Sequence, residues 1–196
     1  MKNDIIDILK KADDLKQKGK LFKAIALYEA ILPHVGDLEL LSWLRITLAD
    51  LYFWVKDFAK AKKFVLDNIA QNPLEPFNYY YFAFLLIGEG NLLEAKKNFE
   101  KAYMLDPSNP EYLRGLGWIE FLFGNYNEAE KILREVLRRD SDNSAARDNL
   151  IELLIKIGNL EEAEKEINNF REKDPKDWQI YYRLQELKNK KKEFKK

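Results

Sequence analysis

The sequence contains no cysteine and a single histidine, His34. Without cysteine, the chain cannot form disulfides, present a thiolate nucleophile or build a cysteine metal site. One histidine without cysteine is also too few for a zinc site or a conventional catalytic triad. We therefore expect no metal site, and we interpret His34 as a loop residue.

The chain also lacks an excess of positive or negative charge, because 33 basic and 33 acidic residues give a formal net charge of +0. Proteins dedicated to nucleic acids or anionic membrane surfaces usually carry a basic excess, so the balance argues against both classes. No stretch approaches the roughly 18 uninterrupted apolar residues of a membrane span, and the N-terminus lacks the apolar core of a signal peptide. These features predict a cytoplasmic protein without a membrane span.

Nucleotide-binding motifs are lacking as well. Gly115 and Gly117 form a Gly-x-Gly pair, but no third glycine follows at the dinucleotide-binding spacing, and the pair lies inside a predicted helix. There is no Walker A sequence. The acidic pair Glu161-Glu162 begins a predicted helix, where carboxylates stabilise the helix dipole. We therefore predict that the protein is not an enzyme and has neither catalytic residues nor a cofactor.

What the sequence does contain is a six-residue motif that occurs three times. It begins with Gly-Asn and ends with Glu-Ala, and it occupies residues 90–95, 124–129 and 158–163. Its alanines therefore recur at a spacing of 34 residues. A fixed period of this size is typical of stacked helix pairs, in which each pair buries its apolar face against its neighbours.

Extending this period along the chain predicts one domain, residues 1–196, made of helix pairs and a last helix. Ala24 and Ala61 lie 37 residues apart, so the first junction carries three extra residues. In the second pair, Lys56-Asp57 replaces the turn Gly-Asn, which predicts a stiffer or differently shaped turn. The predicted repeats are residues 5–37, 38–73, 76–109, 110–143 and 144–177, followed by a capping helix at 178–192.

The repeats resemble the tetratricopeptide repeat family, whose pattern is W-x2-L-G-x2-Y, then A-x3-F, then P. The resemblance implies an all-α, right-handed α-solenoid of antiparallel helix pairs, in which small residues let the helices cross closely. The matching residues are Tyr79, Phe82, Ala83, Leu86, Ala95, Phe99 and Pro107 in the third repeat, and Leu113, Leu116, Gly117, Ala129 and Leu133 in the fourth. The departures are Glu120 in the Tyr slot, Ser141 in the Pro slot, and Arg45 and Arg147 in the Trp slot.

The last helix fits a capping role. Trp178, Tyr181 and Leu184 recur at i, i+3 and i+6, and this stripe is predicted to cover the fifth repeat. Gln185 and Lys188 occupy slots that are small or apolar in the inner repeats, so they would give the cap a polar outer face.

The resemblance also implies that the first helix of each pair lines a concave groove. The residues at the groove positions are mostly aromatic, and exposed aromatic clusters mark interaction surfaces. The alternative is that many of these rings pack against the second helices as core. The candidates are Trp43, Phe53 and Trp54 in the second repeat, Phe77, Tyr80, Tyr81 and Phe84 in the third, and Arg114, Trp118 and Phe121 in the fourth.

The C-terminal half of the groove is more polar. Some tetratricopeptide co-chaperones hold the terminal carboxylate of a peptide with a clamp of Lys, Asn and Arg side chains. Asn149 and Arg183 match positions of that clamp, whereas Trp118 and Gln179 break its pattern. We assign Asn149 and Arg183 to the groove on this resemblance; the alternative is that they are solvated polar residues.

The resulting hypothesis is a non-catalytic scaffold or adaptor that binds a peptide or helical segment of a partner protein in an aromatic concave groove. The alternative is a structural protein that self-assembles into a homo-oligomer through its terminal helix and groove. Binding of nucleic acid through the Lys-rich tail at 188–196 is a third hypothesis. We favour a simpler interpretation of that tail, because cations at a helix C-terminus complement the helix dipole.

Overall fold

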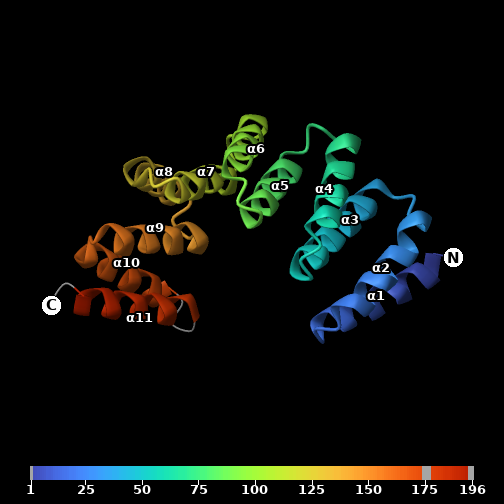
Figure 1. The fold of residues 1–196 in the computed structure, drawn as a ribbon, viewed down its shortest axis with the longest axis horizontal. Helices are drawn as coiled ribbons and strands as arrows, with labels where there is room; N and C mark the ends of the chain where they lie inside the picture. Colours follow the sequence, from blue (N-terminus) through green and yellow to red (C-terminus); the bar gives the residue numbers. More distant parts are fainter. Residues whose placement is uncertain (1, 174–177, 194–196) are drawn as a thin grey trace. The chain divides into compact units, whose positions relative to one another are not determined.

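The computed structural model describes residues 2–173 and 178–193 of the 196-residue chain. The described residues form α-helices and one short 3-10 helix, with no strand among them (Figure 1), so the prediction of an all-α fold is confirmed. None of these helices is long and apolar enough to cross a membrane. The elements are α1 (Lys2–Gln17), α2 (Leu21–Ile31), η1 (Leu32–His34), α3 (Leu38–Trp54), α4 (Phe58–Gln71), α5 (Pro76–Gly88), α6 (Leu92–Leu105), α7 (Pro110–Leu122), α8 (Tyr126–Arg139), α9 (Ser144–Ile157), α10 (Leu160–Lys173) and α11 (Trp178–Glu193).

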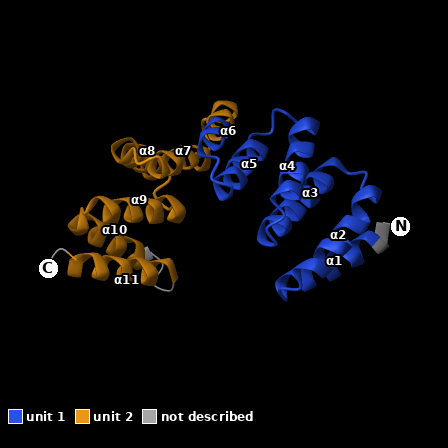
Figure 2. Ribbon diagram, in the orientation of Figure 1, with its two compact units in different colours: residues 1–98 blue, residues 99–196 orange. Residues whose placement is uncertain are grey.

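The chain divides into two compact units, residues 1–98 and 99–196, and the boundary falls within α6 (Figure 2). In unit 1, α1 packs on α2 and α3 on α4, and the pairs meet through α2 with α3 and α4 with α5. In unit 2 the corresponding contacts are α7 with α8, α8 with α9, α9 with α10, and α10 with α11. The single domain over 1–196 stays a prediction, and the predicted end of the fifth repeat, 174–177, lies outside the described residues.

Helix starts in the structure follow from short polar side chains that bind the free N–H groups of the first turn. The carboxylate of Asp37 accepts a hydrogen bond from the Leu40 N–H at 2.7 Å at the start of α3. Asn143 does the same for Ala146 at 2.8 Å at the start of α9. Pro76 and Pro110 occupy the first turns of α5 and α7, where the missing N–H has no helical partner to lose.

The turns inside the helix pairs share one backbone shape. Gly90, Gly124 and Gly158 have φ values of 79°, 80° and 82°, in the left-handed region that favours glycine. Lys56 adopts a similar φ of 64° in the second pair. The following residue there, Asp57, donates its N–H to the Tyr52 carbonyl at 2.9 Å, the same closing bond that the glycine turns make. A different shape for the turn at Lys56-Asp57 was therefore a wrong prediction, because Lys56 adopts the left-handed conformation; a stiffer turn stays a prediction.

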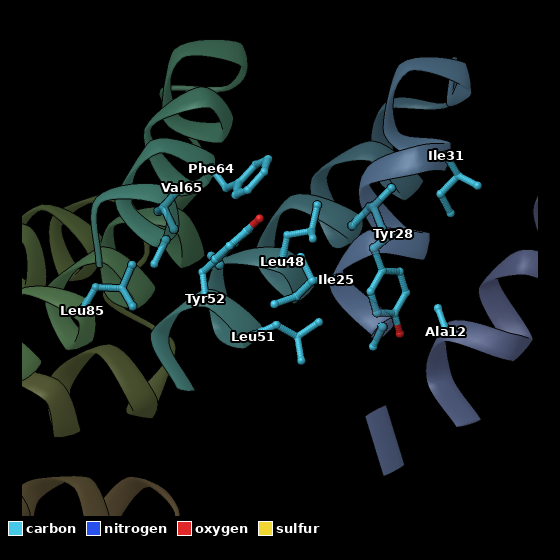
Figure 3. Packing of buried hydrophobic residues seen from close by; sticks show 14 residues of the cluster. Ala12, Ile25, Tyr28, Ile31, Leu48, Leu51, Tyr52, Phe64, Val65 and Leu85 are labelled. Atoms are coloured by element: carbon cyan, nitrogen blue, oxygen red, sulfur yellow. The ribbon is translucent and has the colours of Figure 1, made fainter. Parts of the chain in front are cut away.

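The core of unit 1 is a continuous layer of side chains from α1 to α5 (Figure 3). Tyr28 of α2 is fully buried beside Ala12 of α1, and its hydroxyl donates to the Asp13 carboxylate at 2.5 Å. Tyr52 of α3 is buried and donates to Glu29 of α2 at 2.6 Å. Both phenols bury their rings and satisfy their hydroxyls with carboxylates near the surface.

In unit 2, small residues hold the helices close together. Ala129 and Ala163, two members of the 34-residue series, are fully buried. A Cβ added to Gly117 of α7 would lie 3.1 Å from Leu133 of α8. A Cβ at Gly115 would lie 2.5 Å from the buried ring of Phe99, closer than packed atoms come. The expectation that small residues permit close helix crossing is therefore supported by these positions.

The departures from the repeat pattern are polar residues that find partners. Arg45 donates to Gln71 at 2.8 Å and to Asn68 at 3.2 Å, which joins α3 to the C-terminal end of α4. Arg147 similarly donates to Glu166 of α10 at 2.5 Å. The buried Glu120 accepts a hydrogen bond from the Asn125 side chain at 2.7 Å, across the turn after α7.

The last helix uses a different face from the predicted one. Trp178 and Tyr181 are 73% and 69% exposed, whereas Ile180, Arg183 and Leu187 are buried. Leu184 packs partly against the core of unit 2. The prediction that Trp178 and Tyr181 cover the fifth repeat was therefore wrong: helix α11 does pack on α9 and α10, but it leaves these two rings in solvent.

Candidate functional site

The aromatic candidates of unit 1 come from α3 and α5 and differ in exposure. Trp54, Trp43 and Phe77 are 68%, 44% and 42% exposed. A partner can therefore contact a large part of each ring. Tyr80 is only 9% exposed, which makes it a buried residue. Phe53, Tyr81 and Phe84 are intermediate.

Rings on α5 contact one another along the helix. The Tyr80 ring meets the Phe84 ring edge to face at a centroid distance of 4.9 Å, and Phe77 lies 6.1 Å from Tyr81. The Tyr81 hydroxyl donates to Asp50 of α3 at 3.1 Å. Burial, and then the Asp50 charge, raise the pKa of Tyr81 above its ordinary value, so its hydroxyl stays protonated as a donor.

Phe53 has a packing role in addition to its groove position. Its ring stands 5.4 Å from the Phe58 ring, and a Cβ on Gly88 would lie 2.5 Å from it. Phe53 therefore fills the space between α3 and α5, as the alternative interpretation of these rings anticipates. Among the groove candidates of unit 1, the open rings are thus Trp43, Trp54 and Phe77, which we call the aromatic face.

Beside the aromatic face, unit 1 contains a cleft of about 720 Å³ that sequence reasoning missed. Trp43 and Phe77 form part of its wall. The lining comes from the N-terminal parts of α3 and α5 and the C-terminal end of α4. It therefore combines two groove candidates, Trp43 and Phe77, with residues that were not candidates. The lining residues are Leu38, Glu39, Ser42, Trp43, Ile46, Asn68, Gln71, Asn72, Glu75, Phe77 and Asn78.

The candidates of unit 2 on α7 form a smaller aromatic stack. The Trp118 and Phe121 rings stack at a centroid distance of 5.1 Å, and Phe121 also meets Tyr126 at 5.8 Å. Arg114 forms a salt bridge with Glu111, one turn earlier, at 2.9 Å. A cleft of about 340 Å³ adjoins this stack, and it is lined by Phe121, Leu122, Tyr126, Glu152, Lys156 and Glu186.

The two residues assigned by resemblance to a carboxylate clamp occur in contrasting environments. Arg183 is 7% exposed, and its guanidinium donates to both oxygens of Asp148, to Glu152 and to Glu186. Burial opposes its charge, but the bonds to Asp148 and Glu186 outweigh this effect and raise the pKa of Arg183. Asn149 has a buried side-chain N–H group without a hydrogen-bond partner among the described residues. Arg183 is therefore engaged by carboxylates of its own chain, whereas the Asn149 amide keeps an unused donor.

Over the part of the chain that the structure describes, no group of three or more His, Asp or Glu side chains could hold a metal ion. The arrangement offers aromatic surface, amides and carboxylates, which suit non-covalent binding.

Comparison with known proteins decides the family. A model described as tetratricopeptide repeat matches residues 86–147 and 120–187, which together span more than half of the chain. The chain belongs to the tetratricopeptide repeat family. Its resemblance to the repeat pattern, first seen in the alanine spacing, is thereby confirmed.

Two curated relatives are similar to part of the chain. The TPR repeat-containing protein PA4667 of Pseudomonas aeruginosa is 30% identical over 131 residues, which cover 66% of this chain and 21% of that protein. A BBSome complex member BBS4 homolog of Drosophila melanogaster is 29% identical over 96 residues, 48% of this chain and 19% of that protein. The chain spans about a fifth of the length of these relatives.

Solved structures share the tetratricopeptide fold. The thermophilic protein TTC0263 of Thermus thermophilus has a TM-score of 0.76 and 22% identity, with 93% of this chain and 98% of that chain covered. A tetratricopeptide repeat protein of Parabacteroides merdae has a TM-score of 0.70 and 20% identity, with coverages of 95% and 73%. YrrB, described as having an unusual peptide-binding site, has a TM-score of 0.59 and 17% identity, with coverages of 94% and 93%.

Proposed function

We propose that this protein is a non-catalytic scaffold that binds a peptide or helical segment of a partner protein on the aromatic face of unit 1. The observation that carries the proposal is the large exposure of Trp43, Trp54 and Phe77 on the first helices of two successive repeats. Apolar rings in water favour association, and rigid rings lose little conformational entropy when a partner covers them. The peptide-binding site attributed to the structurally similar YrrB supports the same class of function.

The polar groups beside these rings can fix the register of a bound segment. Asp50 accepts the Tyr81 hydroxyl and stays exposed between α3 and α5. The cleft next to Trp43 and Phe77 adds amide and carboxylate groups. Burial of apolar partner residues supplies the affinity in this proposal, and hydrogen bonds to these groups supply orientation.

Self-assembly is the second candidate function, and the terminal helix favours it. Trp178, Tyr181 and Tyr182 are all exposed on α11. Covering them with a second copy of the chain would remove apolar surface from water. Light scattering after size exclusion, over a range of protein concentrations, separates the candidates: a concentration-dependent oligomer that the double variant W178S/Y181S abolishes supports self-assembly.

A selection experiment tests the peptide-binding proposal. Peptides displayed on phage are selected on the full chain, and their affinities are measured for the W43A and F77A variants. Both variants are expected to lose at least about tenfold in affinity, as truncated interface anchors do. The variant W178A is the matched control, since Trp178 is also an exposed ring but lies on α11, and it should bind as the unaltered chain does. Selected peptides that bind W43A and F77A at full strength would contradict the proposal.

A further inference from the structure

The lining of the cleft beside the aromatic face combines exposed apolar side chains with buried amides. Leu38, Trp43 and Phe77 are large apolar residues that remain exposed, and all three line it. Asn68 and Asn78 also line it, and they are almost completely buried. Its volume of about 720 Å³ is large enough for a long side chain and its flanking peptide groups.

Asn78 is the most informative residue of the cleft. It is 2% exposed, and it lines the cleft. Asn68, which also lines the cleft, is already engaged, because it donates to the Ser42 carbonyl and hydroxyl at 3.0 Å and accepts from Arg45. Asn78 therefore offers one donor group and one acceptor to a molecule that enters the cleft.

The charged groups at the rim are mainly acidic. Glu39 and Glu75 both line the cleft. One oxygen of Glu75 accepts the Phe77 N–H at 3.3 Å, which leaves the second oxygen for another donor. The guanidinium of Arg45 donates to two of the lining residues, Asn68 and Gln71. Two carboxylates and one guanidinium give this part of the cleft a net negative charge.

We propose that this cleft binds a lysine or arginine side chain of the partner peptide, with Glu39 and Glu75 as counter-charges, Trp43 as an aromatic wall and Asn78 as the anchor for the adjoining peptide group. The proposal rests on the peptide-binding function proposed above and specifies which residue type the partner presents. An ammonium or guanidinium group is attracted both by carboxylates and by the face of an indole ring. The aliphatic stem of such a side chain suits Leu38 and Phe77. The peptide N–H and C=O next to it match the amide of Asn78, which can donate and accept at once.

Three small probes test the charge preference directly. The isotope-labelled full chain is titrated with N-acetyl-lysine methylamide, with the neutral isostere N-acetyl-norleucine methylamide, and with N-acetyl-glutamate methylamide, and binding is followed by NMR. The lysine probe should shift the signals of residues 38–46 and 75–78, including the side-chain amide of Asn78, in a saturable way. The norleucine probe should bind about fivefold more weakly, as expected for the loss of two partly exposed ion pairs. The glutamate probe should bind more weakly still.

The double variant E39Q/E75Q removes both charges but keeps the shape of the cleft and the oxygen that caps α5. It should bind the lysine probe about fivefold more weakly and leave the norleucine affinity unchanged. The matched control is E94Q, which removes a surface carboxylate of α6 that pairs with Lys97, and it should leave both affinities unchanged. Equal binding of the lysine and norleucine probes, or unchanged lysine binding by E39Q/E75Q, would overturn the proposal.

The two proposals fail separately. Peptides that need Trp54 and Phe77 but show no preference for lysine or arginine would leave the scaffold function standing and reject the cation site. Lysine-selective binding in the cleft, with no peptide recovered from the phage selection, would support the cation site and count against the scaffold function.

Discussion

Arg183 of α11 donates two hydrogen bonds to the two carboxylate oxygens of Asp148 of α9, at 2.7 and 2.8 Å. Both side chains are almost fully buried. Removing one member of such a pair leaves the other charge uncompensated in a poor solvent, so the effect on stability is larger than for a surface pair. This pair therefore fixes which face of the terminal helix points inward.

The variant R183M should lower the free energy of unfolding by about 3 kcal/mol, because Asp148 would stay buried without a counter-charge. Urea unfolding followed by circular dichroism measures the change. Lys191 provides the matched control, since it is also on α11 and pairs with Glu164 of α10 at 2.7 Å, but in solvent. The variant K191M should change stability by less than about 0.5 kcal/mol. Equal effects of the two variants would show that the Arg183 pair contributes no more than a surface contact.

Lys56 stores strain at the turn of the second helix pair. A left-handed conformation costs a residue with a side chain roughly 1–2 kcal/mol, and glycine has no such penalty but loses more entropy on folding. The variant K56G should therefore stabilise the protein by about 0.5–1 kcal/mol in thermal or urea unfolding. The converse change, G90A, should destabilise it by about 1 kcal/mol through strain alone, because an added Cβ there meets nothing within 4 Å. A loss of stability in K56G would contradict this account.

Glu135 of α8 is predicted to titrate at unusually low pH. Hydrogen bonds from Arg138, and then from Arg139, lower the pKa of Glu135 from its ordinary value of 4.5 to about 2. Because the folded-state pKa is depressed, the stabilisation is present above about pH 4.5 and is lost as the pH falls towards 2. An NMR titration of the side-chain carboxyl carbon checks the midpoint. The double variant R138Q/R139Q should move it upwards, whereas K131Q, which removes the neighbouring pair with Glu128, should not.

The sequence predicted the repeating framework well because that framework depends on residue size and backbone freedom at fixed intervals. Ala129 and Ala163 are buried at helix crossings, and Gly124 and Gly158 take the left-handed turns, as their spacing indicated. The same reasoning failed at Lys56. The hydrogen bond that closes the turn, from the Asp57 N–H to the Tyr52 carbonyl, holds Lys56 in the conformation that glycine adopts in the other turns.

The terminal helix and the cleft could not be predicted in the same way. The stripe of Trp178 and Tyr181 has helical spacing, but the ion pairs of Arg183 with Asp148 and Glu152 select a different face for burial. The cleft around Asn78 is assembled from the ends of three helices, so no periodicity within one helix indicates it.

Trp54 and Tyr80 are both predicted to line the groove, but they differ in exposure, so they test which rings bind and which pack. Trp54 is largely exposed, so the variant W54A should change the free energy of unfolding by less than about 1 kcal/mol. Tyr80 is buried and meets the Phe84 ring, so Y80A should cost about 3 kcal/mol or more. Thermal melts of the two variants measure this difference.

The W54A variant, which should change stability little, should have a large effect on peptide binding. The peptides selected on the full chain are expected to lose about 2 kcal/mol of binding free energy, or roughly thirtyfold in affinity, with the W54A variant. The control is L66A, because Leu66 of α4 is also exposed but belongs to a second helix of its pair, and this variant should keep both its stability and its affinity. If W54A melts several degrees earlier yet binds peptide normally, Trp54 is a packing residue and the aromatic face loses its most exposed member.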